Sequence, residues 1–336
     1  MINSIIFEEQ NETGIVLLNK PKALNALDLE MAESFYSKLN DWKNNENIKR
    51  ILIKGEGKAF CAGGDVKSVS LSSNISNLKK KFFYKEYKLN FAISELPKDY
   101  LSIWNGIVMG GGVGLSIYGN ARIATENSKF AMPETAIGFF PDVGGSYFLS
   151  RMANNVGVYL GLTGKIIRPY EMMFFGISTH FYNSKNIKNV EMNYIKNGTL
   201  PANDKVEEKD SDIINNIDFI HETFEGNIFS IIEKIKKSNT DFAKKTYENI
   251  LTRCPMSLAV SAELFSRAKK LSLKECLEME FQLSQKIVYR EDFNNGVEAV
   301  LITKTYHPKW SPNSINAINK NDIDKLFVDH AEKLKL

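Results

Sequence analysis

Two glycine-rich segments, residues 58–65 (KAFCAGGD) and 109–114 (MGGGVG), have the composition of sites at which backbone amides bind an oxygen atom. Glycine suits such a site because a side chain would hold a ligand away from the backbone. The second segment follows a predicted strand and opens a predicted helix, where unpaired amides meet the positive end of the helix dipole. For one segment alone, a tight turn with packing glycines is the alternative. The pair indicates an oxyanion site with an amide donor from each segment.

Neither segment is a nucleotide-binding motif. The dinucleotide pattern GxGxxG fails because Leu115 stands where the last glycine is required. The phosphate-binding pattern GxxxxGK[ST] fails at Gly164-Lys165, because Ile166 follows and no glycine precedes at the required distance.

Acidic residues near these segments could transfer protons or attack a carbonyl carbon. Glu134 follows Pro133 and Asp142 follows Pro141. Taken alone, Glu134 is a first-turn acid of a helix and Asp142 is an N-cap. Glu86 lies in a lysine-rich predicted helix, where an exposed ion pair is the default interpretation. Two adjacent carboxyl groups do not ionise together readily, so we expect one of Glu134 and Asp142 to stay protonated near neutral pH.

The elements that must position these residues alternate between strand and helix. Residues 4–8 and 14–19 predict a hairpin, and Asp28 caps a predicted helix that runs to Trp42. Further strands are predicted at residues 50–54, 100–105, 122–125 and 129–132, and helices at 78–95 and 112–118. This alternation favours an α/β architecture with parallel crossovers.

The chain changes character toward its C-terminus. Residues 1–185 carry the alternating pattern and every candidate site residue, residues 186–225 are polar and predict a connection or insertion, and residues 226–336 are helical almost throughout. We therefore predict an α/β core followed by a C-terminal helical region.

Composition limits the classes of function. The chain has 336 residues and a formal net charge of +3, below what nucleic-acid binding usually requires, so we expect no nucleic-acid partner. Its 3 cysteines and 4 histidines are scattered without metal-ligand spacing, so we expect no metal. No apolar run reaches membrane-spanning length, and the acidic N-terminal residues do not resemble a targeting signal, so we expect a cytoplasmic protein without a membrane partner.

The sequence resembles the crotonase (enoyl-CoA hydratase/isomerase) superfamily. Residues 20–27 (KPKALNAL), 57–65 (GKAFCAGGD), the GGGVG run and residues 131–134 (AMPE) carry the resemblance in matching order. The string at 130–149 (FAMPETAIGFFPDVGGSYFL), with residues 83–90, 290–302 and 308–310, is similar to the 3-hydroxyisobutyryl-CoA hydrolase branch. The resemblance implies a crotonase-type ββα spiral core.

The resemblance also implies roles for particular residues. The amides of Ala62 and Gly111 would hold a thioester carbonyl oxygen, Glu134 and Asp142 would carry the chemistry, and Glu86 would contact the substrate. A hydratase of this family has a second glutamate at the place occupied here by Gly114. That difference puts addition of water across a double bond in doubt.

The implied activity is hydrolysis of 3-hydroxyisobutyryl-CoA to 3-hydroxyisobutyrate and CoA in valine breakdown, with CoA entering as part of the substrate and no cofactor. Glu134 would activate water or attack the carbonyl itself to form an anhydride. An enoyl-CoA hydratase or isomerase is the first alternative, and a catalytically silent crotonase-fold binding subunit is the second. Family members commonly associate as trimers, so a homo-oligomer is a further expectation. A 3-hydroxypropionyl-CoA substrate differs by one methyl group, a difference worth only about 1–3 kcal/mol.

Overall fold

A computed structural model describes residues 3–73, 76–328 and 332–336. These residues form two compact units, each assembled from three segments of the chain. Unit 1 draws on Met1–Gly64, Lys88–Phe130 and Ile167–Lys209, and unit 2 on Asp65–Tyr87, Ala131–Ile166 and Asp210–Leu336. His330 and the first two residues, which entered the predictions of metal binding and location, lie outside the described residues.

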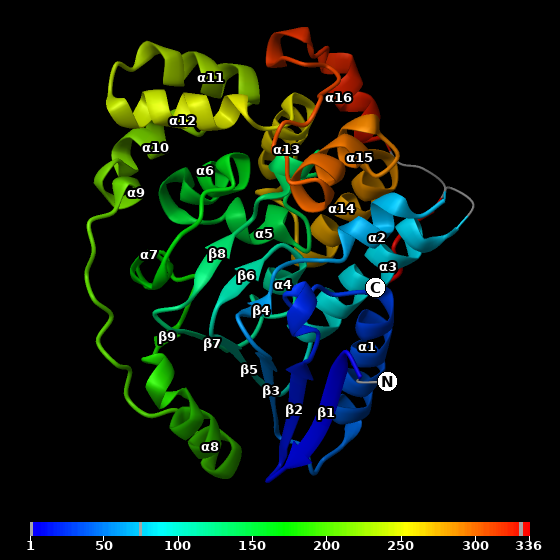
Figure 1. Cartoon of the computed structure of the whole chain (residues 1–336), viewed down its shortest axis with the longest axis vertical. Helices are drawn as coiled ribbons and strands as arrows, with labels where there is room; N and C mark the ends of the chain where they lie inside the picture. The colour runs from blue at the N-terminus through cyan, green and yellow to red at the C-terminus, as the bar shows by residue number, and fades with distance from the viewer. Residues whose placement is uncertain (1–2, 74–75, 329–331) are drawn as a thin grey trace. The chain divides into compact units, whose positions relative to one another are not determined.

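Unit 1 is built on a six-stranded sheet in the order β1-β2-β3-β5-β7-β9 (Figure 1). Its strands are β1 (Ile5–Gln10), β2 (Thr13–Leu18), β3 (Arg50–Gly55), β5 (Asp99–Trp104), β7 (Ala121–Ala124) and β9 (His180–Phe181). β1 and β2 pair antiparallel, and every later pair is parallel. Asn11 and Glu12 both have positive φ, which is the geometry of a tight hairpin turn whose twist matches the strands. The predicted hairpin and the predicted parallel crossovers are confirmed.

Helices cover the sheet of unit 1 where the sequence places apolar stripes. In α1 (Leu29–Asn44), Asp28 caps the first turn by accepting a hydrogen bond from the Met31 amide at 2.9 Å, as predicted. Within residues 186–225, α8 (Ile187–Asn197) buries Val190 and Tyr194 against the same core as Leu52 and Leu101 of the sheet. Unit 1 also contains α7 (Pro169–Phe174), with short 3-10 turns at Pro21–Ala23 and Ser184–Asn186.

A second, three-stranded sheet has the order β4-β6-β8, formed by Ala59–Cys61, Ile107–Met109 and Lys129–Ala131. The short helix α4 (Gly111–Gly114) follows β6 directly. The helix predicted over 112–118 is therefore shorter than expected. Glycines are poor helix formers, and the Ser116 hydroxyl donates to the carbonyls of Gly112 and Val113, which competes with further helical hydrogen bonds.

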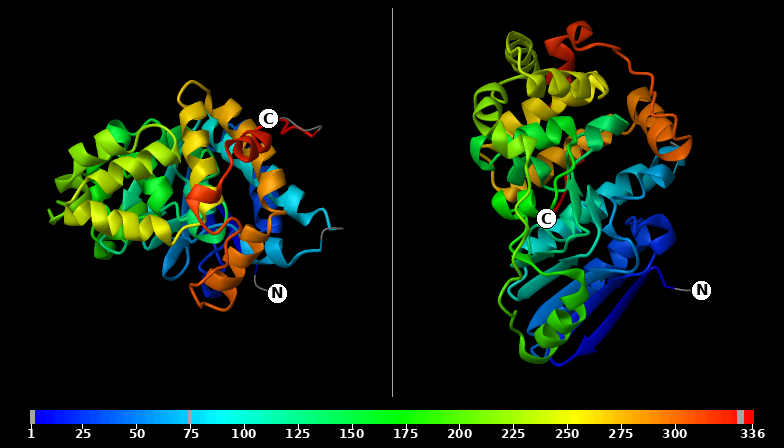
Figure 2. Two further views of the ribbon diagram at one scale, coloured as in Figure 1. Left: turned by 90° about the horizontal axis from the view of Figure 1, so that it is seen from above. Right: turned by 60° about the vertical axis from the view of Figure 1, so that its left-hand side comes forward.

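Unit 2 is helical, as predicted for the C-terminal region. Figure 2 presents its helices from two sides, and α11 (Ile228–Lys237) and α12 (Asp241–Leu251) pack side by side. The others are α2 (Val66–Leu71), α5 (Gly145–Leu149), α6 (Val156–Thr163), α9 (Asp212–Asn215), α10 (Ile217–Thr223), α13 (Pro255–Ala268), α14 (Leu273–Ile287), α15 (Glu291–Val297) and α16 (Lys320–Leu326). Shorter 3-10 turns lie at Glu134–Ile137 (η2), Ala153–Asn155 and Ile315–Ala317, and a π-helical turn at Glu298–Ile302.

The helix α3 (Leu78–Ser94) begins in unit 2 and continues into unit 1. Among the described residues, no helix combines the length and the apolar character that crossing a bilayer requires.

Candidate active site

The two glycine-rich segments leave neighbouring strands of one sheet. β4 and β6 are parallel, with Ala59 opposite Ile107 and Cys61 opposite Val108, so both segments emerge at the same edge of the sheet. They approach so closely that a β-carbon on Gly112 would lie 2.2 Å from the Cys61 carbonyl oxygen. Only glycine fits at this point, because real β-carbons do not come within 3.0 Å of such an atom. The structure thus brings the two predicted segments together within unit 1.

The amide of Gly111 is suited to bind an oxygen. Gly111 is the first residue of α4, where a backbone N–H has no acceptor inside the helix, and it is buried. Among the described residues, none accepts a hydrogen bond from the Gly111 or Gly112 amide. Gly110, in front of them, has φ +49 and ψ −123, a conformation that glycine reaches and other residues avoid.

The amide of Ala62 is engaged. It donates to the Leu24 carbonyl oxygen at 3.0 Å, whereas the next amide, that of Gly63, has no acceptor in the described part of the chain. For Ala62 to bind a substrate oxygen, its hydrogen bond to Leu24 must be exchanged or shared. The sequence therefore predicted the Ala62 amide as the donor, whereas the unpaired amide is that of its neighbour, Gly63.

Three acidic side chains predicted from the sequence are buried in unit 2. Glu86 on α3 is 2% exposed, Glu134 at the start of η2 is 6% exposed, and Asp142 in the turn before α5 is 5% exposed. An exposed ion pair is thus not the role of Glu86. Within the described residues, Oε1 of Glu86 and Oε2 of Glu134 have no hydrogen-bond partner. A buried carboxyl oxygen without a hydrogen-bond partner reduces the stability of the fold. Such unsatisfied groups are typical of sites where a substrate supplies the missing partner.

Two further residues join this cluster and were missed by sequence reasoning. The Tyr87 hydroxyl donates to Oδ2 of Asp142 at 2.7 Å. Glu280 on α14, fully buried, accepts hydrogen bonds from the Gly144 amide at 2.7 Å and from the Ser146 amide at 3.0 Å. A sequence signal for Glu280 did exist: it occupies the apolar face of α14 together with Cys276 and Phe281, where an acid is out of place.

Burial and mutual repulsion shift the titration of these acids. Burial raises the pKa of Glu86 well above its ordinary value, and the charges of Asp142 and Glu134 raise it further. Burial, and then the charge of Asp142, raises the pKa of Glu134 in the same way. Burial raises the pKa of Asp142 to about 7, although the hydrogen bond from Tyr87 works in the opposite direction. The carboxyl groups of the cluster therefore titrate at higher pH than ordinary acids, toward the neutral range in which general acid–base catalysis is most effective.

Aromatic rings supply the apolar surroundings that cause these shifts. Phe139 stacks on Phe140 with ring centroids 4.4 Å apart and on Phe83 at 5.2 Å, and Phe293 lies 5.7 Å from Phe139. All of these rings belong to unit 2. Water is a poor competitor in such an environment, so electrostatic interactions among the acids are strong.

No group of three or more histidine, cysteine, aspartate or glutamate side chains in the described ranges is arranged to hold a metal ion. The three cysteines are free and buried.

Comparisons with known proteins agree with the resemblance noted in the sequence. The family model for enoyl-CoA hydratase/isomerase matches residues 13–327. Among curated proteins, the chain is 37% identical to the "3-hydroxyisobutyryl-CoA hydrolase, mitochondrial" of Danio rerio, covering 99% of this chain and 92% of that protein. It is 38% identical to the protein of the same name from Dictyostelium discoideum, over 96% and 91% of the two chains.

Solved structures confirm the predicted crotonase-type fold with its C-terminal helices. An enoyl-CoA hydratase from Rhodobacter sphaeroides superimposes with a TM-score of 0.92 at 28% identity, covering 99% of this chain and 100% of that one. A carnitinyl-CoA dehydratase from Mycobacterium thermoresistibile gives a TM-score of 0.92 at 31% identity, over 99% and 98%.

The predicted cytoplasmic location is wrong. The curated relatives carry the word mitochondrial in their names, from vertebrates to Dictyostelium discoideum. The prediction rested on the composition of the first residues. Cellular location depends on recognition of targeting segments, and neither the folded core nor its acidic cluster contains information about it.

Proposed function

The chain belongs to the enoyl-CoA hydratase/isomerase family, and we propose that within it the chain hydrolyses 3-hydroxyisobutyryl-CoA to 3-hydroxyisobutyrate and CoA. The relatives that bear this name are 36–39% identical over nearly the whole chain. The observation that carries the proposal is the buried set of acids Glu134, Asp142 and Glu86, combined with Gly114 where a family hydratase has its second glutamate. The location proposed for this reaction is the mitochondrion, as for the relatives.

Backbone amides would hold the thioester carbonyl oxygen. Gly111 supplies one donor and Ala62, after exchange of its bond to Leu24, the other. Both amides are fixed by the β4 and β6 backbone, so little reorganisation is needed as negative charge develops on that oxygen. Removal of one such donor costs about 3 kcal/mol in other acyl-transfer enzymes.

Glu134 would be the reacting acid. As a carboxylate it removes a proton from water while the water oxygen adds to the thioester carbon. The C–S bond then breaks, and the CoA thiolate takes the proton from Glu134. In the alternative, the Glu134 oxygen itself adds to the carbon, the thiolate leaves, and water cleaves the resulting anhydride. Both routes need Glu134 ionised, so its raised pKa places the rise of turnover at higher pH than for an ordinary glutamate.

Asp142 and Glu86 would bind the acyl group. Tyr87 fixes Asp142, whose pKa of about 7 lets it donate or accept a hydrogen bond near neutral pH. The unpaired Oε1 of Glu86 is available to a substrate hydroxyl. A 3-hydroxyl group would thus satisfy buried oxygens that otherwise have no partner, which favours hydroxyacyl over plain acyl substrates. CoA enters as part of the substrate, and we expect no cofactor; a homo-oligomer remains a prediction from the family.

The experiment is a coupled assay with wild-type protein. 3-Hydroxyisobutyryl-CoA is supplied with a thiol reagent that reports free CoA, and crotonyl-CoA is supplied in parallel to detect hydration at its double bond. We expect CoA release and no hydration. Hydration without CoA release would establish the hydratase alternative. If neither reaction occurs, the catalytically silent binding subunit is the alternative that remains. Rates with 3-hydroxypropionyl-CoA in the same assay measure the acyl-chain preference.

The two routes at Glu134 differ in where an oxygen atom from water goes. A single turnover in ¹⁸O-labelled water with enzyme in excess puts the label only in the acid product when Glu134 acts as a base. An anhydride that water cleaves at the glutamyl carbon puts the label in the Glu134 side chain. Mass spectrometry of the peptide that contains Glu134 detects this label, which only the anhydride route produces; label in the acid product alone arises from the base route or from an anhydride cleaved at the acyl carbon.

A further inference from the structure

The turn that carries Asp142 is held in a costly conformation. Val143 has φ +54 and Gly144 has φ +78, two consecutive residues in the left-handed region. Glycine adopts this region freely, but a β-branched residue such as valine adopts it rarely and only with strain. The Gly145 amide closes the turn on the Asp142 carbonyl oxygen at 2.7 Å. A strained turn of this kind persists only where surrounding groups over-determine it.

Glu280 is the group that holds the turn from outside. Its Oε2 accepts from the Gly144 amide and its Oε1 accepts from both the amide and the hydroxyl of Ser146. These three hydrogen bonds fix the residues immediately after Asp142. Glu280 comes from α14, far away in the sequence, and is fully buried. If packing were its only role, a buried carboxyl group at this position would be unfavourable, because an apolar side chain fills the same space without the free-energy penalty of burying a polar group.

We propose that Glu280 is a positioning residue of the acid cluster: its carboxyl group locks the turn 142–146 and thereby sets where the Asp142 carboxyl group lies. The proposal rests on the proposed hydrolase function for its kinetic readout, but not for its structural one. Tyr87 fixes the Asp142 side chain from one direction through its hydroxyl group, and Glu280 fixes the Asp142 backbone from the other. Loss of either hold displaces the same carboxyl group.

Electrostatics gives Glu280 a second influence on the site. Burial raises the pKa of Glu280 to about 8, its hydrogen bonds with Ser146 and Gly144 oppose that rise, and the charge of Asp142 adds to it. The titratable groups that face Glu280 are Asp142, Glu134 and Tyr87, with Cys276 on its own helix. Where Glu280 is ionised, its negative charge contributes to the raised pKa of Glu134. Removal of that charge therefore moves the titration of Glu134 to lower pH.

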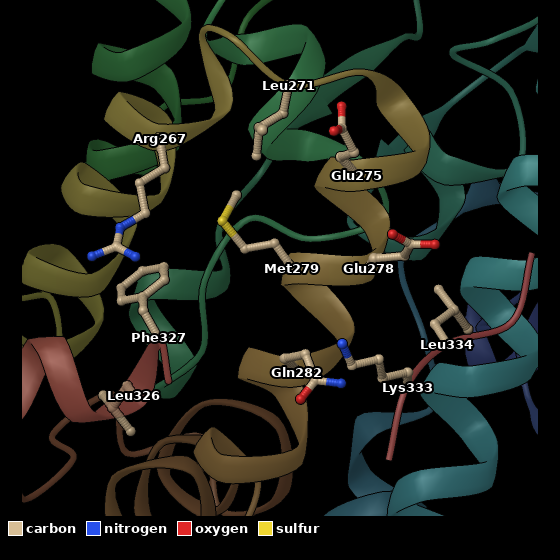
Figure 3. Close-up of a pocket in the computed structure, with 10 residues that line it drawn as sticks. All are labelled: Arg267, Leu271, Glu275, Glu278, Met279, Gln282, Leu326, Phe327, Lys333 and Leu334. Carbon is tan, nitrogen blue, oxygen red and sulfur yellow. The ribbon is translucent and has the colours of Figure 1, made fainter. Parts of the chain in front are cut away.

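Helix α14 provides a matched control. Its other side lines a separate cavity of about 380 Å³ with Glu275, Glu278, Met279 and Gln282 (Figure 3). Glu278 lies two positions before Glu280 on this helix, lines this separate cavity and is not among the buried residues of α14. The variant Glu278→Gln thus removes one acid from the same helix without changing the turn.

The experiment compares Glu280→Gln, Ser146→Ala, the double variant and Glu278→Gln with the wild type. Glutamine has one acceptor oxygen and an NH₂ group that faces a backbone donor, so Glu280→Gln loses the bond from Gly144. Because a displacement of about 1 Å can cost roughly a hundredfold in rate, we expect kcat to fall about ten- to a hundredfold. Ser146→Ala removes only the hydroxyl contact and should have a smaller effect. The effects of the two substitutions should not add, because both act on one carboxyl group.

Two readouts separate positioning from general destabilisation. Amide hydrogen exchange in peptides covering residues 142–149 should accelerate at least tenfold in Glu280→Gln and stay unchanged in Glu278→Gln. The rise of kcat with pH should move to lower pH in Glu280→Gln, which a loosened core alone would not produce. Unchanged exchange in the turn, or wild-type kcat in Glu280→Gln, would overturn the proposal. An inactive wild type would instead overturn the hydrolase function, and the exchange measurement would still decide the role of Glu280.

Discussion

At the scale of single residues, the amide of Gly111 is the donor that the structure leaves most clearly available. It stands at the first position of α4 and has no acceptor among the described residues. This position is also the one where a helix accepts proline, which has no N–H, without other loss. Gly110 before it has no β-carbon, which removes one of the clashes that a residue before proline ordinarily makes. A backbone donor can therefore be removed by ordinary substitution.

We expect Gly111→Pro to lower kcat about 100- to 1,000-fold, the loss typical of one oxyanion donor. Gly111→Ala keeps the amide and adds a β-carbon at the same position, so it is the control. Both variants are compared with the wild type by CoA release from 3-hydroxyisobutyryl-CoA and by circular dichroism. Equal losses in the two variants would mean that space at position 111, and not the N–H group, matters for turnover.

The residues that lie in continuous motifs could be predicted from the sequence. Gly111, Glu134 and Asp142 stand in such strings, and the structure places Glu134 and Asp142 in one buried cluster. Glu280 could not be assigned in this way, because its partner Gly144 is 136 positions away. The engagement of Ala62 by Leu24 was equally hidden, since Leu24 reaches this carbonyl geometry only through a φ of +51.

At the scale of elements, η2 sets the position of Glu134, and Gly138 ends η2 with φ +73. A β-carbon on Gly138 would lie 2.3 Å from the Asp292 carbonyl oxygen at the start of α15. The element that carries the proposed reacting acid therefore packs directly on the backbone of α15. The motif around Glu134 predicted the acid, but it contained no information about α15, which completes the packing from the distant C-terminal region.

Gly138→Ala is expected to destabilise the protein by about 2–4 kcal/mol, because it combines an unfavourable φ with a backbone clash. Gly176→Ala is the matched control: Gly176 has φ +69, and nothing lies within 4 Å of its β-carbon position. The control should cost only about 1 kcal/mol from its φ. Urea denaturation of both variants measures the free energies of unfolding. Similar losses would show that the contact with Asp292 has no energetic weight.

At the scale of the whole molecule, the acid cluster makes the free energy of unfolding smaller at neutral pH than at acidic pH. The folded-state pKa of Asp142, about 7, exceeds the ordinary value of 3.8, and that of Glu280, about 8, exceeds 4.5. Between these values the folded state binds more protons than the unfolded state, so the free energy of unfolding falls as pH rises. The stabilisation is fully present below pH 4 and is lost as pH rises through 7 and 8.

We expect the unfolding free energy to decrease between pH 5 and pH 8.5, and Asp142→Asn to reduce this decrease. One pKa unit corresponds to about 1.4 kcal/mol, so the shift of Asp142 accounts for up to about 4 kcal/mol, shared with the acids that titrate with it. Asparagine still accepts from Tyr87, so the fold is kept while turnover falls steeply. Denaturation at several pH values measures the effect. A wild-type protein more stable at pH 8.5 than at pH 5 would contradict the raised pKa values.

The overall architecture was predictable to the extent that it follows from local periodicity. The strands β1, β2, β3, β5, β7 and β8 and the helices α1 and α3 appear close to their predicted limits, whereas the short strands β4 and β6 were not predicted. Sequence periodicity could not predict that each unit is assembled from three separate segments, because this assembly depends on contacts between distant residues.

The ribosome makes residues 142–146 long before it makes Glu280. The strained turn and its later support are separated by 134 to 136 positions, and chains grow at about 5–20 residues per second. For roughly 7 to 27 seconds, each new molecule therefore carries Asp142 on a turn that lacks its hydrogen bonds to Glu280. The Asp142 carboxyl group, proposed to bind the acyl group, gains this support only after α14 has been made, and a prematurely ended chain would lack it.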